Sequence, residues 1–339
     1  MAKAKNIPGI NCEGAAAEAI GLVLITRFKE MCALRDRAMD WIDPEGVHDM
    51  RVSSRRVRGA LRDFMPYVHK RKLSVVLEQL RPIADALGAV RDQDVAIMGL
   101  QKLASGAPVE AAAMLDELVR ARETIRKEAR KDLQKSLHKG QLKQLEKDFD
   151  TAINSVTVKS EPRKRQSTNA QASAEITYRE VARRIIMERL KEVEKLSDAL
   201  YRPLRIKPLH KMRIAAKRLR YALELFEPCW GPGISMFAKK VAALQASLGE
   251  LHDSDIWIET FGEHLNGLEK EPKDRATAAL WLLSHFVRLH SKHLRNTLGK
   301  WRDWEANEFG SRLRDCLQQD SVVPVPAGDI LSTPPMTEA

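Results

Sequence analysis

The chain has 339 residues and a formal net charge of +11, from 57 Lys and Arg against 46 Asp and Glu. Aromatic residues make up only 5% of it and charged residues 30%, a composition that favours long helices and argues against an all-β sandwich. The length fits two domains of ordinary size. The excess of positive charge indicates an anionic partner.

Neither a membrane span nor a signal peptide is expected. The longest uncharged apolar run near the N-terminus, 19–26, is far shorter than the roughly 20 residues of a membrane helix. Glu13 and Glu18 interrupt the region that a signal peptide would need. The four cysteines are widely scattered: Cys12, Cys32, Cys229 and Cys316. They form no CxxC pair, which argues against a disulfide scaffold or a zinc site and for a reducing compartment. We therefore expect a soluble, cytoplasmic protein without metal or other cofactor.

An internal repeat organises the sequence. Residues 47–68 and 209–230 are identical at nine of 22 positions. A second pair of blocks, 86–94 and 247–255, follows at nearly the same offset. Two blocks in the same order and register indicate a duplication.

The repeat predicts two helical halves. The first is placed at 10–155 and the second at 176–318. Residues 156–175 between them lack apolar periodicity and are typical of a solvated linker. Residues 319–339 contain four prolines and are predicted to be disordered.

Four amphipathic stretches are predicted in each half. They fall at about 15–41, 44–65, 70–104 and 110–150, and then at 176–201, 208–227, 233–268 and 273–318. We expect breaks within the longer stretches at Gly88, Gly249 and 106–108, and Pro44 and Pro208 at first helical positions. The predicted fold is all-α, with two four-helix bundles related by an approximate twofold axis.

The repeated helix carries a basic stripe beside an apolar seam. The first stripe is His48, Arg51, Arg55, Arg58 and Arg62, and the second stripe is His210, Arg213, Lys217 and Arg220. The seams are Val47, Met50, Val57, Leu61, Phe64 and Val68, and Leu209, Met212, Leu219, Leu223 and Phe226. Steps of three and four keep each set on one helix face. A solvated face normally mixes signs, because like charges at these spacings repel. No acid interrupts either stripe, which favours an anion site.

Arginine forks at intervals of one helical turn suit a linear series of phosphates, since each guanidinium binds two oxygens. His48 and His210 lie at the head of the stripes, where they either contact a ligand or are structural. The last long helices add basic positions with helical spacing: Arg122, Arg126 and Arg130, and His285, Arg288, Lys292 and Arg295. For these, a solvated face and an anion site are equally compatible with the pattern.

These residues resemble the signature of the CHAD domain, the conserved histidine α-helical domain. The motif H-x-x-R-x-x-x-[KR]-R-x-R occurs at 48–58 and 210–220, and L-G-x-x-[RH]-D-x-D at 87–94 and 248–255. The resemblance implies two four-helix bundles around a basic central cavity that binds inorganic polyphosphate, with association with polyphosphate granules. Many relatives carry a catalytic triphosphate-tunnel domain built on strands, for which this helical chain has no room. We therefore expect no enzymatic activity and no catalytic residues.

Parts of the sequence also match a Mg²⁺ site, an HD-type phosphohydrolase and a nucleic-acid-binding protein. Asp92 with Asp94, and Asp253 with Asp255, suit Mg²⁺, but they suit helix caps or partners that orient the arginines better. The His-Asp dipeptides at 48–49 and 252–253 are typical of an HD-type phosphohydrolase. In the other copy of the repeat, however, the matching dipeptides are His-Lys at 210–211 and Arg-Asp at 91–92, so the His-Asp pair is not repeated whereas the arginines are. Nonspecific nucleic-acid binding is the stronger alternative, since counterion release draws any basic surface to a phosphate backbone. The Trp and Tyr residues do not alternate with the stripes, so no base-stacking platform is expected. The sequence leaves the oligomeric state open.

Overall fold

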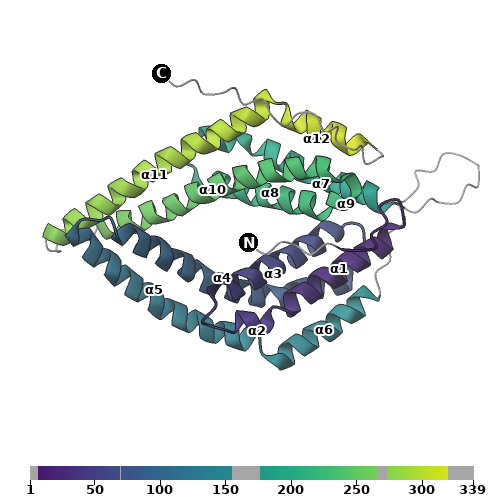
Figure 1. The fold of residues 1–339 in the computed structure, drawn as a ribbon, viewed down its shortest axis with the longest axis horizontal. Coiled ribbons are helices and arrows are strands. Elements are labelled where there is room, and N and C mark those ends of the chain that lie inside the picture. The colour runs from purple at the N-terminus through teal and green to yellow at the C-terminus, as the bar shows by residue number, and fades with distance from the viewer. Residues whose placement is uncertain (1–6, 69, 155–175, 266–272, 320–339) are drawn as a thin grey trace, which may run out of the picture.

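The computed structural model describes residues 7–68, 70–154, 176–265 and 273–319 (Figure 1). Within these ranges the chain forms twelve α-helices, one 3₁₀ helix and no β-strand, which confirms the all-α prediction. The first six helices are α1 (Ala16–Cys32), α2 (Arg35–Ala38), α3 (Pro44–Phe64), α4 (Lys70–Ala104), α5 (Val109–Ser136) and α6 (Lys139–Ile153). The others are α7 (Tyr178–Lys195), η1 (Ser197–Tyr201), α8 (Ile206–Leu225), α9 (Glu227–Trp230), α10 (Pro232–Leu265), α11 (Lys273–Ala306) and α12 (Phe309–Gln318).

Several predicted stretches are divided in the structure. The stretch 110–150 becomes α5 and α6, and 273–318 becomes α11 and α12. The expected break at 106–108 separates α4 from α5. The expected breaks at Gly88 and Gly249 were wrong, because α4 and α10 run through both glycines.

The two helices that carry the basic stripes, α3 and α8, each have a proline in the first turn. Pro44 is the first residue of α3, as predicted, and the side chain of Asp43 accepts a hydrogen bond from Glu45 N at 2.9 Å. The prediction for Pro208 was wrong by two residues, since α8 begins at Ile206. Pro208 still lies in the first turn, where a backbone N–H has no partner within the helix.

The helices outline an elongated four-sided ring (Figure 1). Two long antiparallel pairs, α4 with α5 and α10 with α11, meet at one corner, where α5 packs on α11. A hydrophobic cluster that includes Leu115, Phe261 and Phe286 joins them there. At the opposite corner α1 and α3 pack against α7 and α8.

The apolar seams of α3 and α8 are buried, as predicted. Phe64 of α3 and Phe226, which directly follows α8, meet edge to face with ring centroids 5.9 Å apart, and Tyr178 of α7 lies 5.4 Å from Phe226. These rings belong to one hydrophobic cluster that contains residues of α1, α3, α7, α8 and α10. The boundary between 10–155 and 176–318 stays a prediction, and both clusters cross it.

A disulfide joins two of the four cysteines at the second corner, although their scatter in the sequence argued against a disulfide scaffold. Cys12 is bonded to Cys229, with the two Cα atoms 5.5 Å apart, while Cys32 and Cys316 are free thiols. The partners lie 217 residues apart in the sequence. Only the fold brings them together, so the scatter of cysteines carries no information about the cellular compartment.

The predicted linker 156–175 lies outside the described residues, as does the predicted tail 319–339 apart from Gln319. Among the helices that the structure describes, none has the length and hydropathy needed to cross a membrane.

Two glycines of α3 have opposite surroundings, which predicts opposite effects on stability. A Cβ on Gly46 would overlap the backbone carbonyl of Arg37, whereas a Cβ on Gly59 would meet nothing within 4 Å. We expect Gly46→Ala to destabilise the protein by about 1–3 kcal/mol, because backbone must move. Gly59→Ala should stabilise it by about 0.5–1 kcal/mol, because alanine loses less chain entropy in a helix. Urea unfolding of both variants measures this difference. Equal midpoints would contradict the prediction.

Candidate polyanion-binding site

The two stripes lie close enough for the side chains of one to shift the pKa values of the other. Burial lowers the pKa of Arg51 on α3, Arg55 lowers it further, and Arg91 and Arg213 act in the same direction. Arg55 belongs to the same helix as Arg51, Arg91 comes from α4 and Arg213 from α8. Cationic side chains from both halves of the chain therefore converge on one region.

Glycines in the neighbouring helices make room for this arrangement. A Cβ on Gly88 of α4 would lie 3.9 Å from Nε and Nη2 of Arg51, and a Cβ on Gly249 of α10 would lie 3.6 Å from Nε of Arg213. The two contacts join corresponding positions of the sequence repeat. At both positions an alanine Cβ would lie at ordinary van der Waals distance from the arginine, so each guanidinium passes close to the helix backbone.

Acidic residues one turn further along orient the arginines. Arg51 Nη2 donates to Asp92 Oδ1 at 2.8 Å. Burial raises the pKa of Asp253; Arg213 opposes that shift, and Asp92 adds to it. Asp92 is thus an ion-pair partner, one of the two roles that the sequence indicated for it.

A hollow of about 440 Å³ opens beside these groups. Arg51, Arg55 and Arg58 of α3 line one side of it. The other side is formed by α4, where Gly88 and Asp92 face the arginines. The hollow is large enough to hold several phosphate groups side by side.

Lys217 of α8 shows how strongly positive this region is. Burial lowers the pKa of its ammonium to about 7, and Arg55 and Arg213 contribute in the same direction, followed by Arg51 and Arg218. The neighbours with the largest effect on this pKa are all cationic. An anion bound beside Lys217 would therefore stabilise the charge of its ammonium.

The histidines at the N-terminal end of the two stripes have lowered pKa values, mainly because they are partly buried. Burial, and then Arg91, lower the pKa of His48. Burial, and then Arg213 and Lys217, lower that of His210. The ring of His210 lies 4.6 Å from that of His252, whose pKa falls to about 4 because of burial, Arg213 and His210.

The stripes do not extend equally far. Arg62 remains exposed at the end of α3, whereas Arg220 of α8 is buried and lies 3.3 Å from Glu224 Oε1. Glu224 occupies the repeat position that corresponds to Arg62. The second stripe thus ends in an internal ion pair.

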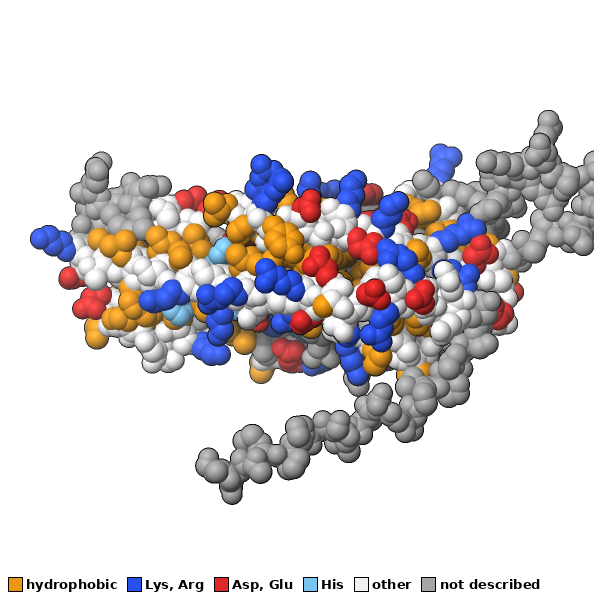
Figure 2. Space-filling view, turned by 90° about the horizontal axis from the view of Figure 1, so that it is seen from above, with side chains coloured by type: hydrophobic (Ala, Val, Ile, Leu, Met, Phe, Trp, Pro, Cys, Tyr) orange, Lys and Arg blue, Asp and Glu red, His pale blue; other side chains and the backbone are white. Residues whose placement is uncertain are grey.

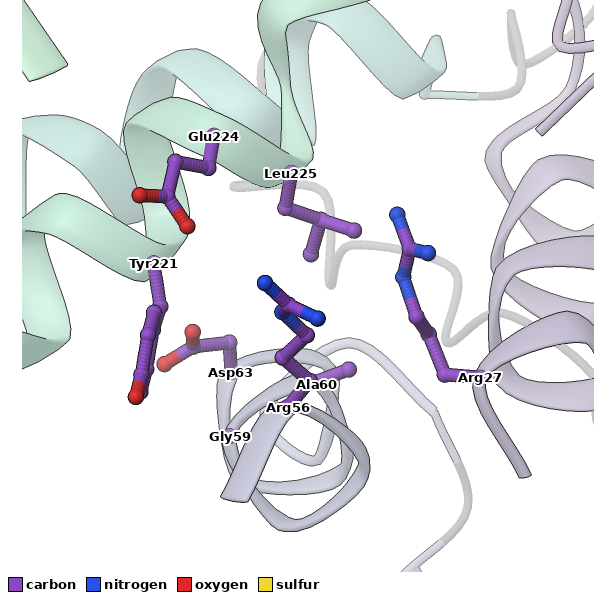
Figure 3. Close-up of a pocket in the computed structure, with 8 residues that line it drawn as sticks. All are labelled: Arg27, Arg56, Gly59, Ala60, Asp63, Tyr221, Glu224 and Leu225. Atoms are coloured by element: carbon purple, nitrogen blue, oxygen red, sulfur yellow. The ribbon is translucent and has the colours of Figure 1, made fainter. Parts of the chain in front are cut away.

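Beyond Arg220, a small internal pocket separates the stripe helices from α1 (Figure 3). Arg27 and Arg56 enter it together with Glu224 and Asp63, so its charges are mixed. Asp63 also accepts hydrogen bonds from Arg189 of α7 at 3.0 and 2.7 Å. This pocket holds two basic and two acidic side chains, whereas the hollow is lined by three arginines against Asp85 and Asp92.

The basic residues predicted on the outer helices have different surroundings. Arg126 Nη1 lies 3.3 Å from the buried Asp94, and Arg130 stacks on Trp41 at 4.9 Å from the ring centroid. Arg288, Lys292 and Arg295 are exposed on α11, whereas Arg122 and His285 are half-buried. The outer face seen in Figure 2 mixes basic, acidic and hydrophobic side chains. None of these seven residues lines the hollow described above.

Within the described residues, one group of side chains has the spacing of metal ligands. Glu45, His48 and Asp49 bring donor atoms within 4.8 Å of one another. Asp49 is buried and already accepts a hydrogen bond from Arg37 at 2.6 Å. Asp255, one of the weighed Mg²⁺ ligands, lies 3.1 Å from His290 Nε2. The absence of a metal stays a prediction.

Arg91 and His252 lie beside the stripes, but from the sequence they were named only as motif positions and not as binding residues. Each follows the glycine of its block, Gly88 or Gly249, by three residues. That spacing places them one helical turn away, on the same face as the glycine. The sequence contains this spacing, but the spacing predicts a shared helix face only if α4 and α10 continue through the glycines, as they do in the structure.

Comparison with known proteins supports the fold and the motifs. The family model described as "CHAD domain" matches residues 23–262. Two curated proteins of Mycobacterium tuberculosis, uncharacterized protein Rv2226 of strain H37Rv and uncharacterized protein MT2285 of strain CDC 1551, are each 27% identical over 229 residues. That match covers 67% of this chain and 42% of each relative, so the chain spans about two fifths of their length.

Two solved structures have a similar fold. The CHAD domain from the plant Ricinus communis superposes with a TM-score of 0.62 at 21% identity, over 88% of this chain and 95% of that one. PptA from Streptomyces chartreusis gives a TM-score of 0.59 at 14% identity, over 85% and 100%. At these identities the likeness concerns the fold alone.

The buried charge of Lys217 predicts a stability change with a defined pH dependence. Its folded pKa, about 7, lies below the ordinary value of 10.5. Between these values the unfolded chain binds a proton that the folded chain does not, so wild-type stability rises with pH through that window. Lys217→Met should therefore raise the urea midpoint at pH 7, with a gain that shrinks toward pH 10. Lys211→Met, an exposed position on the same helix, is the control. A gain independent of pH would contradict the prediction.

Proposed function

The chain belongs to the CHAD domain family, and from that premise we propose that it binds inorganic polyphosphate along its two basic stripes. One observation carries the proposal: Arg51, Arg55, Arg213 and Lys217 are partly buried beside one another, and they lower the pKa of Arg51 and Lys217. Such a cluster is unfavourable in the free protein. A ligand with closely spaced negative charges relieves the repulsion.

The shape of the site favours a linear polyanion. The first stripe steps along one helix face from residue 48 to residue 62, a rise of about 21 Å. Each guanidinium can hold two phosphate oxygens at once and stays charged at any relevant pH. A chain of phosphates can follow the first stripe while residues of the second stripe bind it from the opposite half.

We propose that the protein holds polyphosphate without cleaving it. Asp92 is paired with Arg51, and Asp94 with Arg126, so these acids serve the arginines rather than a catalytic metal. By the same proposal the protein acts at polyphosphate granules. Nucleic acid shares the phosphate chemistry and is the competing ligand in the experiment below.

Titration calorimetry at physiological salt tests the proposal, with long-chain polyphosphate set against a DNA oligomer of matched charge. We expect polyphosphate to bind at least 100-fold more tightly. The double variant Arg51→Gln, Arg213→Gln should lose about 100-fold in affinity, because each charge-assisted contact contributes about 1.5–3 kcal/mol. Affinity should also fall steeply with salt, through counterion release.

The matched control is Arg71→Gln, Arg302→Gln, which removes the same charge from exposed positions. Equal losses in both double variants, or equal affinity for DNA, would mean that only net charge matters. The variant Arg288→Gln, Arg295→Gln measures the share of the outer row, which the proposal expects to be smaller than that of the stripes.

Binding should be linked to the protonation of Lys217. Phosphates favour the ammonium, so the complex raises its pKa above the free value of about 7. Affinity should therefore increase as pH falls from about 9 to 7, with proton uptake visible in buffers of different ionisation enthalpy. Lys217→Arg should bind tightly without this dependence, and Lys217→Gln weakly without it. A slope that survives in both variants would assign the proton elsewhere.

The histidines act in a lower range. Histidine ordinarily titrates near pH 6.5, but burial and neighbouring cations lower the pKa of both His48 and His210 below that value. Their contribution to binding should therefore begin below pH 6.5 and disappear in the variant His48→Ala, His210→Ala.

A further inference from the structure

A second cavity, of about 310 Å³, lies between α7, α11 and α12, outside the basic stripes. Its walls include Trp301, Trp304 and Phe309. Trp304 and Phe309 are stacked with ring centroids 3.9 Å apart, and Trp301 lies 5.6 Å from Trp304. Its volume falls at the lower end of the range for small-molecule sites.

The charge of this cavity is opposite to that of the protein as a whole. Three carboxylates line it, from Glu194, Glu305 and Glu308, against the single guanidinium of Arg314. Arg314 Nη2 donates to both oxygens of Glu194, at 2.7 and 2.5 Å. Two carboxylates therefore remain in excess, in a chain whose net charge is +11. In Figure 2, acidic side chains are more frequent toward the α12 end of the outer face.

The position of Glu308 is unusual. Its φ of 48° is the only positive value at a non-glycine residue within the described ranges. It is the N-cap residue of α12, yet its side chain makes no capping hydrogen bond. A left-handed glutamate costs conformational energy, and here that cost is not offset by a cap. Glu305, one turn earlier, accepts a hydrogen bond from Trp301 Nε1 at 2.8 Å, which ties one carboxylate to the aromatic wall.

Aromatic rings beside carboxylates are the surroundings that alkylammonium groups favour, because the ring faces and the carboxylates both attract a cation. The excess of two carboxylates matches a ligand with two positive charges. An anion is disfavoured, since the guanidinium of Arg314 is already taken by Glu194. We propose that this cavity binds a linear diamine or polyamine. The proposal does not depend on polyphosphate binding by the stripes.

Titration calorimetry of the full chain with 1,4-diaminobutane and with spermidine tests the proposal. Polyphosphate is left out, because it would itself bind the amines. We expect saturable binding of both amines with one site per chain, and none of 1,4-butanediol, which has the same length without charge. Glu308→Gln should weaken amine binding at least tenfold, while Glu128→Gln, an exposed position on α5, should not change it.

Nuclear magnetic resonance of the indole N–H groups locates the amine. The signals of Trp301 and Trp304 should shift on titration, and that of Trp41 should not. A thermal midpoint equal to that of the wild type shows that Glu308→Gln is folded. Full binding by that folded variant, binding of butanediol, or shifts confined to other tryptophans would overturn the proposal. A lysine-containing peptide that binds while both free amines do not would also overturn it and assign the cavity to a protein partner.

Discussion

The basic region requires that the fold hold several like charges side by side. Arg51, Arg55, Arg213 and Lys217 repel one another, and burial makes the repulsion stronger because water screens it less. The apolar seams on the adjacent faces of the same two helices provide the compensating free energy. Each seam residue is buried, and the rings of Phe64, Tyr178 and Phe226 join α3, α7 and α8 into one packed unit. The helices cannot separate to relieve the repulsion without opening this core.

This constraint explains the closed outline of the molecule. The stripe helices alone would be fixed only at one corner. The long pairs α4 with α5 and α10 with α11 extend from them and are joined at the far corner by the second hydrophobic cluster. The disulfide between Cys12 and Cys229 adds a covalent link at the near corner. With both corners closed, the distance between the two halves of the basic region is set by packing rather than by the charges themselves.

The sequence predicted what depends on periodicity and little of what depends on distant contacts. The seams and stripes of α3 and α8 follow from spacings of three and four, and their burial agrees with that pattern. Arg220 has the same spacing, yet it is buried against Glu224, because the acid one turn later lies in reach. The pairing of Cys12 with Cys229 has no local signal at all. Gly88 and Gly249 were predicted as helix breaks, because glycine lowers helix propensity. In the structure both lie within continuous helices, each beside an arginine from another helix, a contact that no local pattern indicates.

The second motif of the repeat places three groups beside each stripe. The glycine lies next to the arginine of the stripe, the residue one turn later is Arg91 or His252, and the next residue is Asp92 or Asp253. In the first half, Asp92 holds Arg51 by a hydrogen bond of 2.8 Å. A Cβ at either glycine would lie at ordinary van der Waals distance from the guanidinium, 3.9 Å at Gly88 and 3.6 Å at Gly249. In both halves of the chain the repeat therefore brings a glycine, a basic residue and an acid of α4 or α10 next to an arginine of α3 or α8, because the helical turn that separates the glycine from the other two keeps all three on one side of the helix.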